Sequence, residues 1–244
     1  LAYLLTGTLV VEEIFAIPGL GSYFITSMTT LKDSLVAIGC FPTINEGFDS
    51  SLPTFTQTLA DLRNFSAYSE SRPVEESAAV LHFFFQRASE IVESYGGRIH
   101  EFKGDGMLAI WDRHEKTDAR ASYHAALEIL DRLNHQLLET YSPEGLEPLS
   151  VGIGIEQGTA LIGFIGPAHR RAQALLGSTV SIAIRIQEMT SDLAQPVLLG
   201  SAIARRLEGE EVESQGSYLL VGLKIPHVLF APAPPAKSAR NDDS

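Results

Sequence analysis

The chain has 244 residues, of which 45% are hydrophobic and 20% are charged, which is enough apolar material for one well-packed globular domain and an additional segment. Thirty acidic residues against eighteen basic ones give a formal net charge of −12, and this charge excludes a general nucleic-acid-binding protein because it repels phosphate backbones. The single cysteine, Cys40, excludes an internal disulfide framework and a metal cluster held by several cysteines. Its isolation favours a reducing compartment, and we expect a cytoplasmic domain.

The first forty residues are largely apolar. The stretch from Ile14 to Leu31 carries no charge. Pro18, two glycines and several Ser and Thr residues nevertheless lower its hydrophobicity below that of a convincing membrane-spanning helix. The sequence LLTGTLVVEEIFAIPGLGSYFITSM resembles the C-terminal part of oligopeptide-type ABC transporter permeases. We therefore expect residues 1–40 to be a permease-like remnant and a candidate membrane tether. The chain begins with Leu1, so a fragment of a longer protein with an upstream regulatory domain is also expected.

Residues 41–52 are predicted to be a linker, because Pro42, Asn45, Gly47 and Asp49 favour turns and no periodicity is visible. The sequence from residue 53 to residue 232 reads as one domain of alternating strands and helices. The tail from residue 233 to residue 244 is rich in Pro, Ala, Ser and Asp and is predicted to be disordered.

The first half of this domain predicts a strand, a helix and a hairpin. A threonine-rich run from Thr54 favours a strand that ends near Asp61. Pro73 begins a helical pattern that Gly96 and Gly97 end. The runs RIHEF and MLAIW then flank a tight turn whose tip carries Asp105.

The second half predicts two helices and further strands. A helix is expected over residues 118–141, and another begins near Ser178. The runs LSVGIGI and TALIGFI are interpreted as two strands joined through residues 156–158. The last strands are expected in PVLLG, YLLVG and HVLFA.

Asp61 and Asp105 are the candidate metal ligands. Both are predicted at strand or hairpin ends of one sheet, where two converging carboxylates could hold two divalent ions roughly 4 Å apart. Mg²⁺ suits such oxygen ligands. Two aspartates in a chain with thirty acidic residues can equally be solvated turn residues, so their flanking sequences decide between the two interpretations.

Four segments resemble the catalytic domain of class III adenylate and guanylate cyclases. LADLRNFS resembles the family's F-A-D-[IL]-x-G-F-[ST] motif, and GGRIHEFKGDGMLAIW resembles G-G-x-x-x-K-x-x-G-D-x-x-x-A-x-F. LSVGIGIEQGTALIGFIG resembles the hairpin G-I-G-x-H-x-G-x-x-x-x-G-x-I-G, and LLGSTVSIAIRIQ resembles the helix I-G-D-T-V-N-x-A-x-R-[LM]. The resemblance covers residues 53–232. It implies an α+β fold with a ferredoxin-like βαββαβ core and additional strands, and a homodimer with active sites at its interface.

The resemblance assigns two metal ions, Mg²⁺ or Mn²⁺, to Asp61, Asp105 and the backbone carbonyl of Leu62. It also assigns the segment from Leu62 to Ser66, with Asn64, Phe65 and Ser66 as nucleotide-binding residues, to the triphosphate of ATP or GTP. Asn64 stands where the family has glycine, and we expect it to adopt positive φ, which asparagine tolerates better than most residues.

The residues assigned to the transition state follow the family pattern only in part. Arg185 matches the family's arginine, which would meet charge on the triphosphate of the opposite protomer. Ser181 stands where the family has an asparagine, and a hydroxyl or a water it holds would replace the amide. Val221 stands where many relatives have lysine, which leaves Lys224 as a substitute.

The choice of base is open at this point. Glu101 stands where adenylate cyclases have lysine and guanylate cyclases have glutamate, and a carboxylate can accept hydrogen bonds from guanine. Its usual partner position is Ala174, which matches neither group. An exposed strand glutamate without a role is the alternative.

The sequence therefore predicts a signalling enzyme that forms a 3′,5′-cyclic nucleotide and pyrophosphate. Ser181, Ala174 and Val221 motivate the alternative of a catalytically weak or silent cyclase-like module that regulates or dimerises. A remnant membrane component, suggested by residues 1–40, is a third interpretation.

Overall fold

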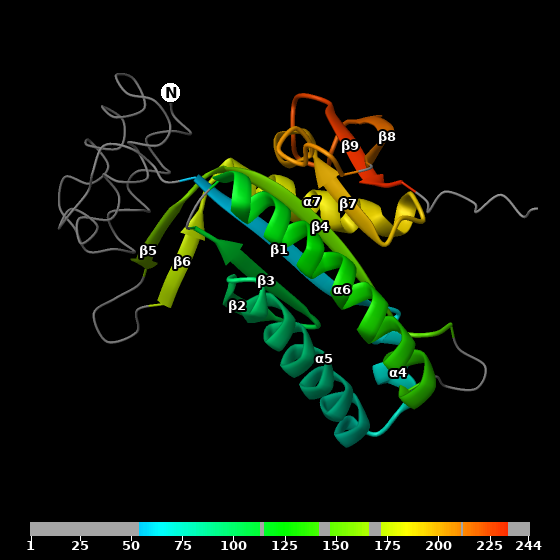
Figure 1. Cartoon of the computed structure of the whole chain (residues 1–244). Helices are drawn as coiled ribbons and strands as arrows, with labels where there is room; N and C mark the ends of the chain where they lie inside the picture. Colours follow the sequence, from blue (N-terminus) through cyan, green and yellow to red (C-terminus); the bar gives the residue numbers. More distant parts are fainter. Residues whose placement is uncertain (1–53, 113–114, 142–146, 166–171, 211, 234–244) are drawn as a thin grey trace, which may run out of the picture. The chain divides into compact units, whose positions relative to one another are not determined.

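The computed structural model describes residues 54–112, 115–141, 147–165, 172–210 and 212–233 (Figure 1). The predicted permease-like remnant, the linker and the tail beyond residue 233 lie outside the described residues. No helix in the described part is long and apolar enough to cross a membrane. The described residues belong to two units, a first that contains residues 162–165 and 172–174 and a second that contains the other described residues.

The described part of the first unit consists of most of a two-stranded sheet formed by β5 and β6. Its strands are β5 (Leu161–Ile165) and β6 (Ala172–Leu176).

The second unit is built on a seven-stranded sheet in the order β2-β3-β1-β4-β7-β9-β8. The strands are β1 (Thr54–Arg63), β2 (Arg98–Lys103), β3 (Gly106–Trp111), β4 (Ser150–Thr159), β7 (Val197–Gly200), β8 (Val212–Tyr218) and β9 (His227–Pro232). The helices are α4 (Phe65–Ser71), α5 (Val74–Ser94), α6 (Glu115–Tyr141), α7 (Ser178–Asp192) and α8 (Ser201–Ala204).

The chain order β1-α5-β2-β3-α6-β4 and the spatial order β4-β1-β3-β2 make a ferredoxin-like core. β4 then pairs in parallel with β7, and β9 and β8 extend that edge. The expected α+β class with additional strands is thereby confirmed. The predicted hairpin is present, and α5 begins directly after Pro73 and is followed by Gly96 at φ 76°.

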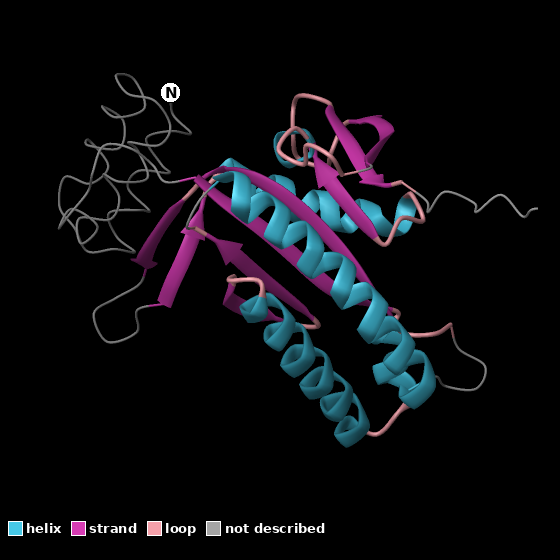
Figure 2. Ribbon diagram, viewed as in Figure 1, coloured by secondary structure: helices cyan, strands magenta, loops and turns pink. Residues whose placement is uncertain are grey.

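Helices α5 and α6 cover one face of this sheet, and α7 covers the other (Figure 2). Alternate side chains of β4 point to opposite faces, as in any strand. Ile153 and Ile155 join the core beneath α5 and α6. Fully buried members of that core include Phe84, Trp111, Ile129, Leu133 and Leu137.

The face of β4 beneath α7 is lined by glycines. A Cβ atom at Gly154 would lie 2.4 Å from the backbone nitrogen of Gln187 and 2.7 Å from its Cα. A Cβ atom at Gly158 would lie 2.4 Å from Thr179 Oγ1. Because backbone atoms of a packed helix cannot give way cheaply, the absence of side chains lets α7 lie directly on the sheet.

Two strand predictions are wrong. Strand β4 runs without a break from Ser150 to Thr159, so residues 156–158 are not a turn; Glu156 and Gln157 are buried within the sheet instead. The run YLLVG is not a strand, because β8 ends at Tyr218, and Leu219 and Val221 are 64% and 73% exposed. In both cases pairing with other strands decides whether a strand forms, and the local sequence pattern does not contain that information.

Several boundaries also differ from expectation. Strand β1 continues past Asp61 to Arg63, because each of its last residues pairs with β4. Helix α6 begins three residues earlier than predicted, at Glu115 instead of residue 118. The short elements α4, β6 and α8 were not predicted.

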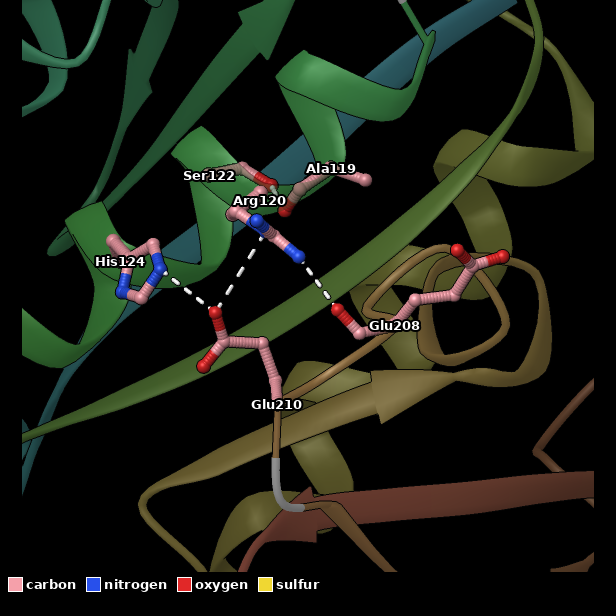
Figure 3. A network of polar contacts seen from close by, with 6 residues as sticks. All are labelled: Ala119, Arg120, Ser122, His124, Glu208 and Glu210. Atoms are coloured by element: carbon pink, nitrogen blue, oxygen red, sulfur yellow. Dashed lines mark hydrogen bonds and ion pairs between the residues drawn. The ribbon is translucent and has the colours of Figure 1, made fainter.

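A polar network ties α6 to the segment between α8 and β8 (Figure 3). Glu210 Oε1 lies 3.0 Å from His124 Nε2 and 3.7 Å from Arg120 Nε. The Arg120 guanidinium also donates to the carbonyl of Glu208 at 2.5 Å. These side chains are partly solvated, so each ion pair contributes at most about 1 kcal/mol.

Glu156 is a carboxyl group buried in the sheet, with 6% of its surface exposed. Its Oε1 accepts a hydrogen bond from the backbone N–H of Gln157 at 2.8 Å, and the N–H groups of Ala202 and Ile203 also donate to it. A Cβ atom at Gly200 would lie 2.0 Å from its Oε2. Burial raises the pKa of Glu156, the three backbone donors lower it, and the net result is a pKa of about 7.

This raised pKa predicts that the protein loses stability as the pH rises from about 4.5 to about 7. The folded state holds the Glu156 proton more tightly than the unfolded state, so its contribution is complete below pH 4.5 and lost above pH 7. The shift corresponds to about 3 kcal/mol at most. We expect the free energy of unfolding of Glu156→Gln, measured by urea denaturation, to rise relative to wild type by up to about this amount between pH 4.5 and 7.5.

Asp61 contributes equally to both proteins and cancels in this comparison. Two pH profiles that run parallel would show that Glu156 is not the group responsible.

Candidate active site

The fold brings Asp61 and Asp105 together. Asp61 pairs with Gly106 across β1 and β3, which places Asp105 at the adjoining hairpin tip. The backbone N–H of Leu62 donates to the carbonyl of Asp105 at 3.3 Å. The two-residue turn is possible because Gly104 adopts φ 62°, a conformation that suits glycine. We call Asp61 and Asp105 the aspartate pair.

The aspartate pair opens into a cavity of about 620 Å³. The cavity is lined by residues 61–66 together with Asp105, Glu147, Ser150, Gln187, Glu188, Ser191 and Ala194. Four acidic residues and one arginine line this space, so its field favours cations.

The Asp61 carboxyl is strained electrostatically. Burial and, to a lesser degree, the nearby charge of Asp105 raise its pKa, whereas a hydrogen bond from the Gln187 side chain lowers it, and the net pKa is about 6. Gly106 leaves room for this carboxylate, since a Cβ atom there would lie 2.9 Å from Asp61 Oδ1. Two carboxylates that repel one another in a partly buried cavity are the chemistry that a divalent cation relieves.

These residues fit a divalent metal. The donor set combines two carboxylates with a backbone carbonyl at Leu62 beside an open cavity, and Mg²⁺ commonly binds through one or two carboxylates while substrate phosphates and water complete its shell. No cluster of three or more His, Cys, Asp or Glu side chains that could hold a metal occurs among the described residues. The donor set therefore suits a metal site in which the substrate supplies the remaining ligands.

The segment after β1 turns sharply at Asn64. Its φ of 65° lies in the left-handed region, as expected from the glycine that it replaces. The side-chain amide donates to the carbonyl of Pro148 at 3.0 Å, which holds the turn against the segment before β4. Asn64, Phe65 and Ser66 then line the cavity at the start of α4.

Comparison with known families decides the identity of the fold. The family model described as "Adenylate and Guanylate cyclase catalytic domain" matches residues 51–229. The chain belongs to this family.

Two bacterial adenylate cyclases illustrate the similarity in sequence. Adenylate cyclase 1 of Rhizobium meliloti is 32% identical over 151 residues, which cover 61% of this chain and 22% of that protein. The adenylate cyclase of Anabaena cylindrica is 28% identical over 165 residues, which cover 66% of this chain and 32% of that protein. The chain thus spans about a fifth to a third of the length of these relatives.

Two solved structures illustrate the similarity in fold. The adenylyl cyclase CyaB from P. aeruginosa superposes with a TM-score of 0.67 at 20% identity, covering 78% of this chain and 97% of that one. The guanylyl cyclase Cya2 superposes with a TM-score of 0.62 at 28% identity, covering 75% of this chain and 95% of that one. The α+β cyclase fold is therefore shared with enzymes named for either nucleotide.

The remaining residues that the cyclase motifs single out do not line the cavity of the aspartate pair. Arg185 lies on α7, where its Nη1 contacts both carboxylate oxygens of Glu188 at 2.7 Å. Ser181 is exposed one turn earlier on the same helix. Within one cyclase chain, the aspartate pair and these two residues are thus separate groups.

The two base-contacting candidates are placed differently. Glu101 is exposed on β2 and pairs with Leu108, which in turn pairs with Leu59. Because directly paired residues share a face, Glu101 lies on the same face as Asp61. Ala174 lies on β6, in the other compact unit.

The motifs do not single out several residues of the cavity, and Gln187 is one of them, whereas Arg63 lies within the predicted triphosphate segment without a role of its own. Arg63 follows Leu62, and its Nη2 donates to the carbonyl of Gln195 at 2.8 Å, while burial lowers its pKa. Gln187 lies two residues after Arg185 and hydrogen-bonds Asp61. Residues two apart on a helix point in different directions, so the sequence predicts that Gln187 and Arg185 lie on different faces of α7. Only the packing of α7 on β4 shows which element Gln187 faces.

The electrostatic coupling of the aspartate pair predicts a pKa change in a variant. Asp105→Asn removes the charge that repels the Asp61 carboxylate, so the pKa of Asp61 should fall from about 6 toward its ordinary value of 3.8. The fall is incomplete, because burial is the larger cause. Carbon-13 NMR of the aspartate carboxyl groups in metal-free protein measures it.

Asp112→Asn is the matched control, because that exposed carboxylate pairs with Arg98 and not with Asp61. An unchanged pKa of Asp61 in Asp105→Asn would contradict the coupling.

Proposed function

We propose that this chain is the catalytic domain of a class III nucleotide cyclase that converts ATP or GTP into a 3′,5′-cyclic nucleotide and pyrophosphate. The observation that supports it most is the aspartate pair, which converges on one cavity within the family-matched residues 51–229. The product would serve as a signal in the cytoplasm, with residues 1–40 as a candidate membrane tether.

In this reaction the ribose 3′-oxygen forms a bond to the α-phosphorus. The bond from the α-phosphorus to the oxygen that bridges to the β-phosphorus breaks, and pyrophosphate leaves with that electron pair. The proton of the 3′-hydroxyl passes to solvent. Two Mg²⁺ or Mn²⁺ ions, when bound, would lower the pKa of that hydroxyl and offset the charge of the triphosphate.

The residues of the cavity would divide this work among them. Asp61, Asp105 and the carbonyl of Leu62 would hold the metals. The segment from Asn64 to Ser66 would enclose the triphosphate, since the left-handed Asn64 turns the backbone there away from β1. Arg63 is engaged with the carbonyl of Gln195 and would hold the wall of the cavity in place.

A homodimer would complete the site. Arg185 and Ser181 do not line the cavity of their own chain, which is the arrangement expected if they serve the site of a second copy. Arg185 would then stabilise charge on the triphosphate, and Ser181 or a water that it holds would support the transition state.

Both purine nucleotides are candidate substrates. The exposed carboxylate of Glu101 lies on the same face of the sheet as Asp61 and can accept hydrogen bonds from the N–H groups of guanine. Ala174 supplies only a methyl group, and proteins similar to this chain are named for either activity. Parallel assays with ATP and GTP separate the two.

Shared sites predict complementation between inactive chains. Asp61→Ala should abolish cyclic-nucleotide formation, because it removes a metal ligand, and Arg185→Ala should reduce it severely. A mixture of the two should recover activity, since one site of the heterodimer keeps both Asp61 and Arg185. Cyclic-nucleotide formation is measured before and after mixing, with Mg²⁺ or Mn²⁺ present.

Formation of the mixed dimer is verified with two different affinity tags. Recovery that fails despite mixed dimers would count against shared sites, and full activity of Asp61→Ala would sink the metal assignment.

Replacing Ser181 with asparagine is predicted to raise the turnover. Ser181→Asn restores the amide that the family places there, and a donor that acts mainly in the transition state raises turnover more than substrate binding. The gain should approach roughly a hundred-fold, less what serine and water already supply. Steady-state kinetics with each nucleotide measure kcat and KM for both proteins.

Ser178→Asn, at the exposed start of the same helix, is the control and should leave turnover unchanged. If Ser181→Asn does not raise kcat in a folded dimer, serine is an adequate replacement. If neither protein cyclises either nucleotide, the chain is a silent cyclase-like module.

A further inference from the structure

Gln187 lines the cavity of the aspartate pair from a third element of the fold. It belongs to α7, whereas Asp61 belongs to β1 and Asp105 to the hairpin between β2 and β3. Its side chain lines the same cavity as Asp61, where its amide, as a hydrogen-bond donor, lowers the pKa of the Asp61 carboxyl. An amide donor adds no charge to a site that already has four acidic residues in its lining.

The closeness of α7 to the sheet makes this contact possible. Gly154 pairs with Leu59 on β1, two residues before Asp61. A Cβ atom at Gly154 would lie 2.4 Å from the backbone nitrogen of Gln187. The backbone of Gln187 therefore packs directly against β4, and this packing fixes the position of its Cα atom.

The Asp61 carboxylate is thus confined from two directions. On the side of β3 it lies over Gly106, where a Cβ atom would approach Oδ1 to 2.9 Å. On the side of α7 the Gln187 amide binds it. A carboxylate has acceptor sites on both oxygens, so a hydrogen bond to one of them restricts its orientation and leaves acceptor sites free for a cation.

We infer that Gln187 is a positioning residue that holds the Asp61 carboxylate in the orientation in which the aspartate pair binds a divalent metal. The inference rests on the proposed function, because it supplies the supporting contact for the metal site of that function. Groups that orient a metal ligand commonly change metal affinity by about ten- to a hundred-fold when they are removed.

Gln187→Leu tests the inference, because leucine has a similar size and cannot donate. The probe is Mn²⁺ alone, titrated into the full, nucleotide-free chain while electron paramagnetic resonance counts the unbound ion. We expect the dissociation constant for Mn²⁺ to rise about ten-fold. Gln136→Leu, an exposed glutamine on α6 away from the cavity, should leave it unchanged.

Gly154→Ala provides a second variant that leaves the Gln187 side chain intact but forces α7 away from β4. It should weaken Mn²⁺ binding in the same direction, and circular dichroism and thermal unfolding check that both variants fold. In cyclase assays at saturating nucleotide, Gln187→Leu should need about ten-fold more Mn²⁺ for half-maximal rate, and saturating Mn²⁺ should restore most of kcat.

A dissociation constant in folded Gln187→Leu within two-fold of wild type would overturn the inference. So would a wild-type chain that binds no Mn²⁺ at millimolar concentration. If wild type binds Mn²⁺ and Gln187→Leu binds it more weakly, but neither ATP nor GTP is cyclised, then the positioning role holds and the proposed function fails.

Discussion

The close contact between α7 and the glycine-lined face of β4 is the constraint on which the site depends. At Gly154 the atoms of α7 nearest to the strand are backbone atoms of Gln187 and Ala183, so backbone atoms set the separation of strand and helix there. Interiors packed in this way respond to added volume with strain, because the helix cannot move without disturbing its other contacts. The position of α7 is consequently fixed relative to β1, which is the neighbour of β4.

This constraint means that the packing of the fold itself positions the residues of the cavity. Three elements that are distant in sequence supply its charged centre: the end of β1, the β2–β3 hairpin and α7. The antiparallel pairing of β1 and β3 brings the two carboxylates together in spite of their repulsion. Folding therefore pays an electrostatic cost there, and such costs are characteristic of functional sites.

The sequence predicted the core of the fold and the centre of the site well, for identifiable reasons. The helix after Pro73 and the hairpin at Asp105 carry strong local signals, namely a 3.6-residue period and a turn between alternating strands. The left-handed conformation of Asn64 was expected because it replaces the glycine of the cyclase motif and asparagine tolerates positive φ. The metal assignment of the aspartate pair and the roles of Arg185 and Ser181 stay predictions.

Predictions failed where tertiary contacts override local pattern. Glu156 and Gln157 look like turn residues, but they continue β4 because β1 pairs with them and backbone N–H groups of α8 satisfy the Glu156 carboxylate. Gln187 could not be assigned, because periodicity gives the face of a helix but not the partner on which it packs. The apolar run after Tyr218 has strand composition without a strand to pair with.

The ion pair between Arg185 and Glu188 has a consequence for how two copies of the chain would communicate. Glu188 lines the cavity of its own chain, and its carboxylate is neutralised by Arg185 at 2.7 Å. If Arg185 turned toward a triphosphate bound by a second copy, it would leave Glu188 as an uncompensated negative charge in its own cavity. That charge would attract metal ions and repel nucleotide, so binding at one site would change the electrostatic potential at the other. In such a homodimer, Arg185 would link the electrostatic potentials of the two sites.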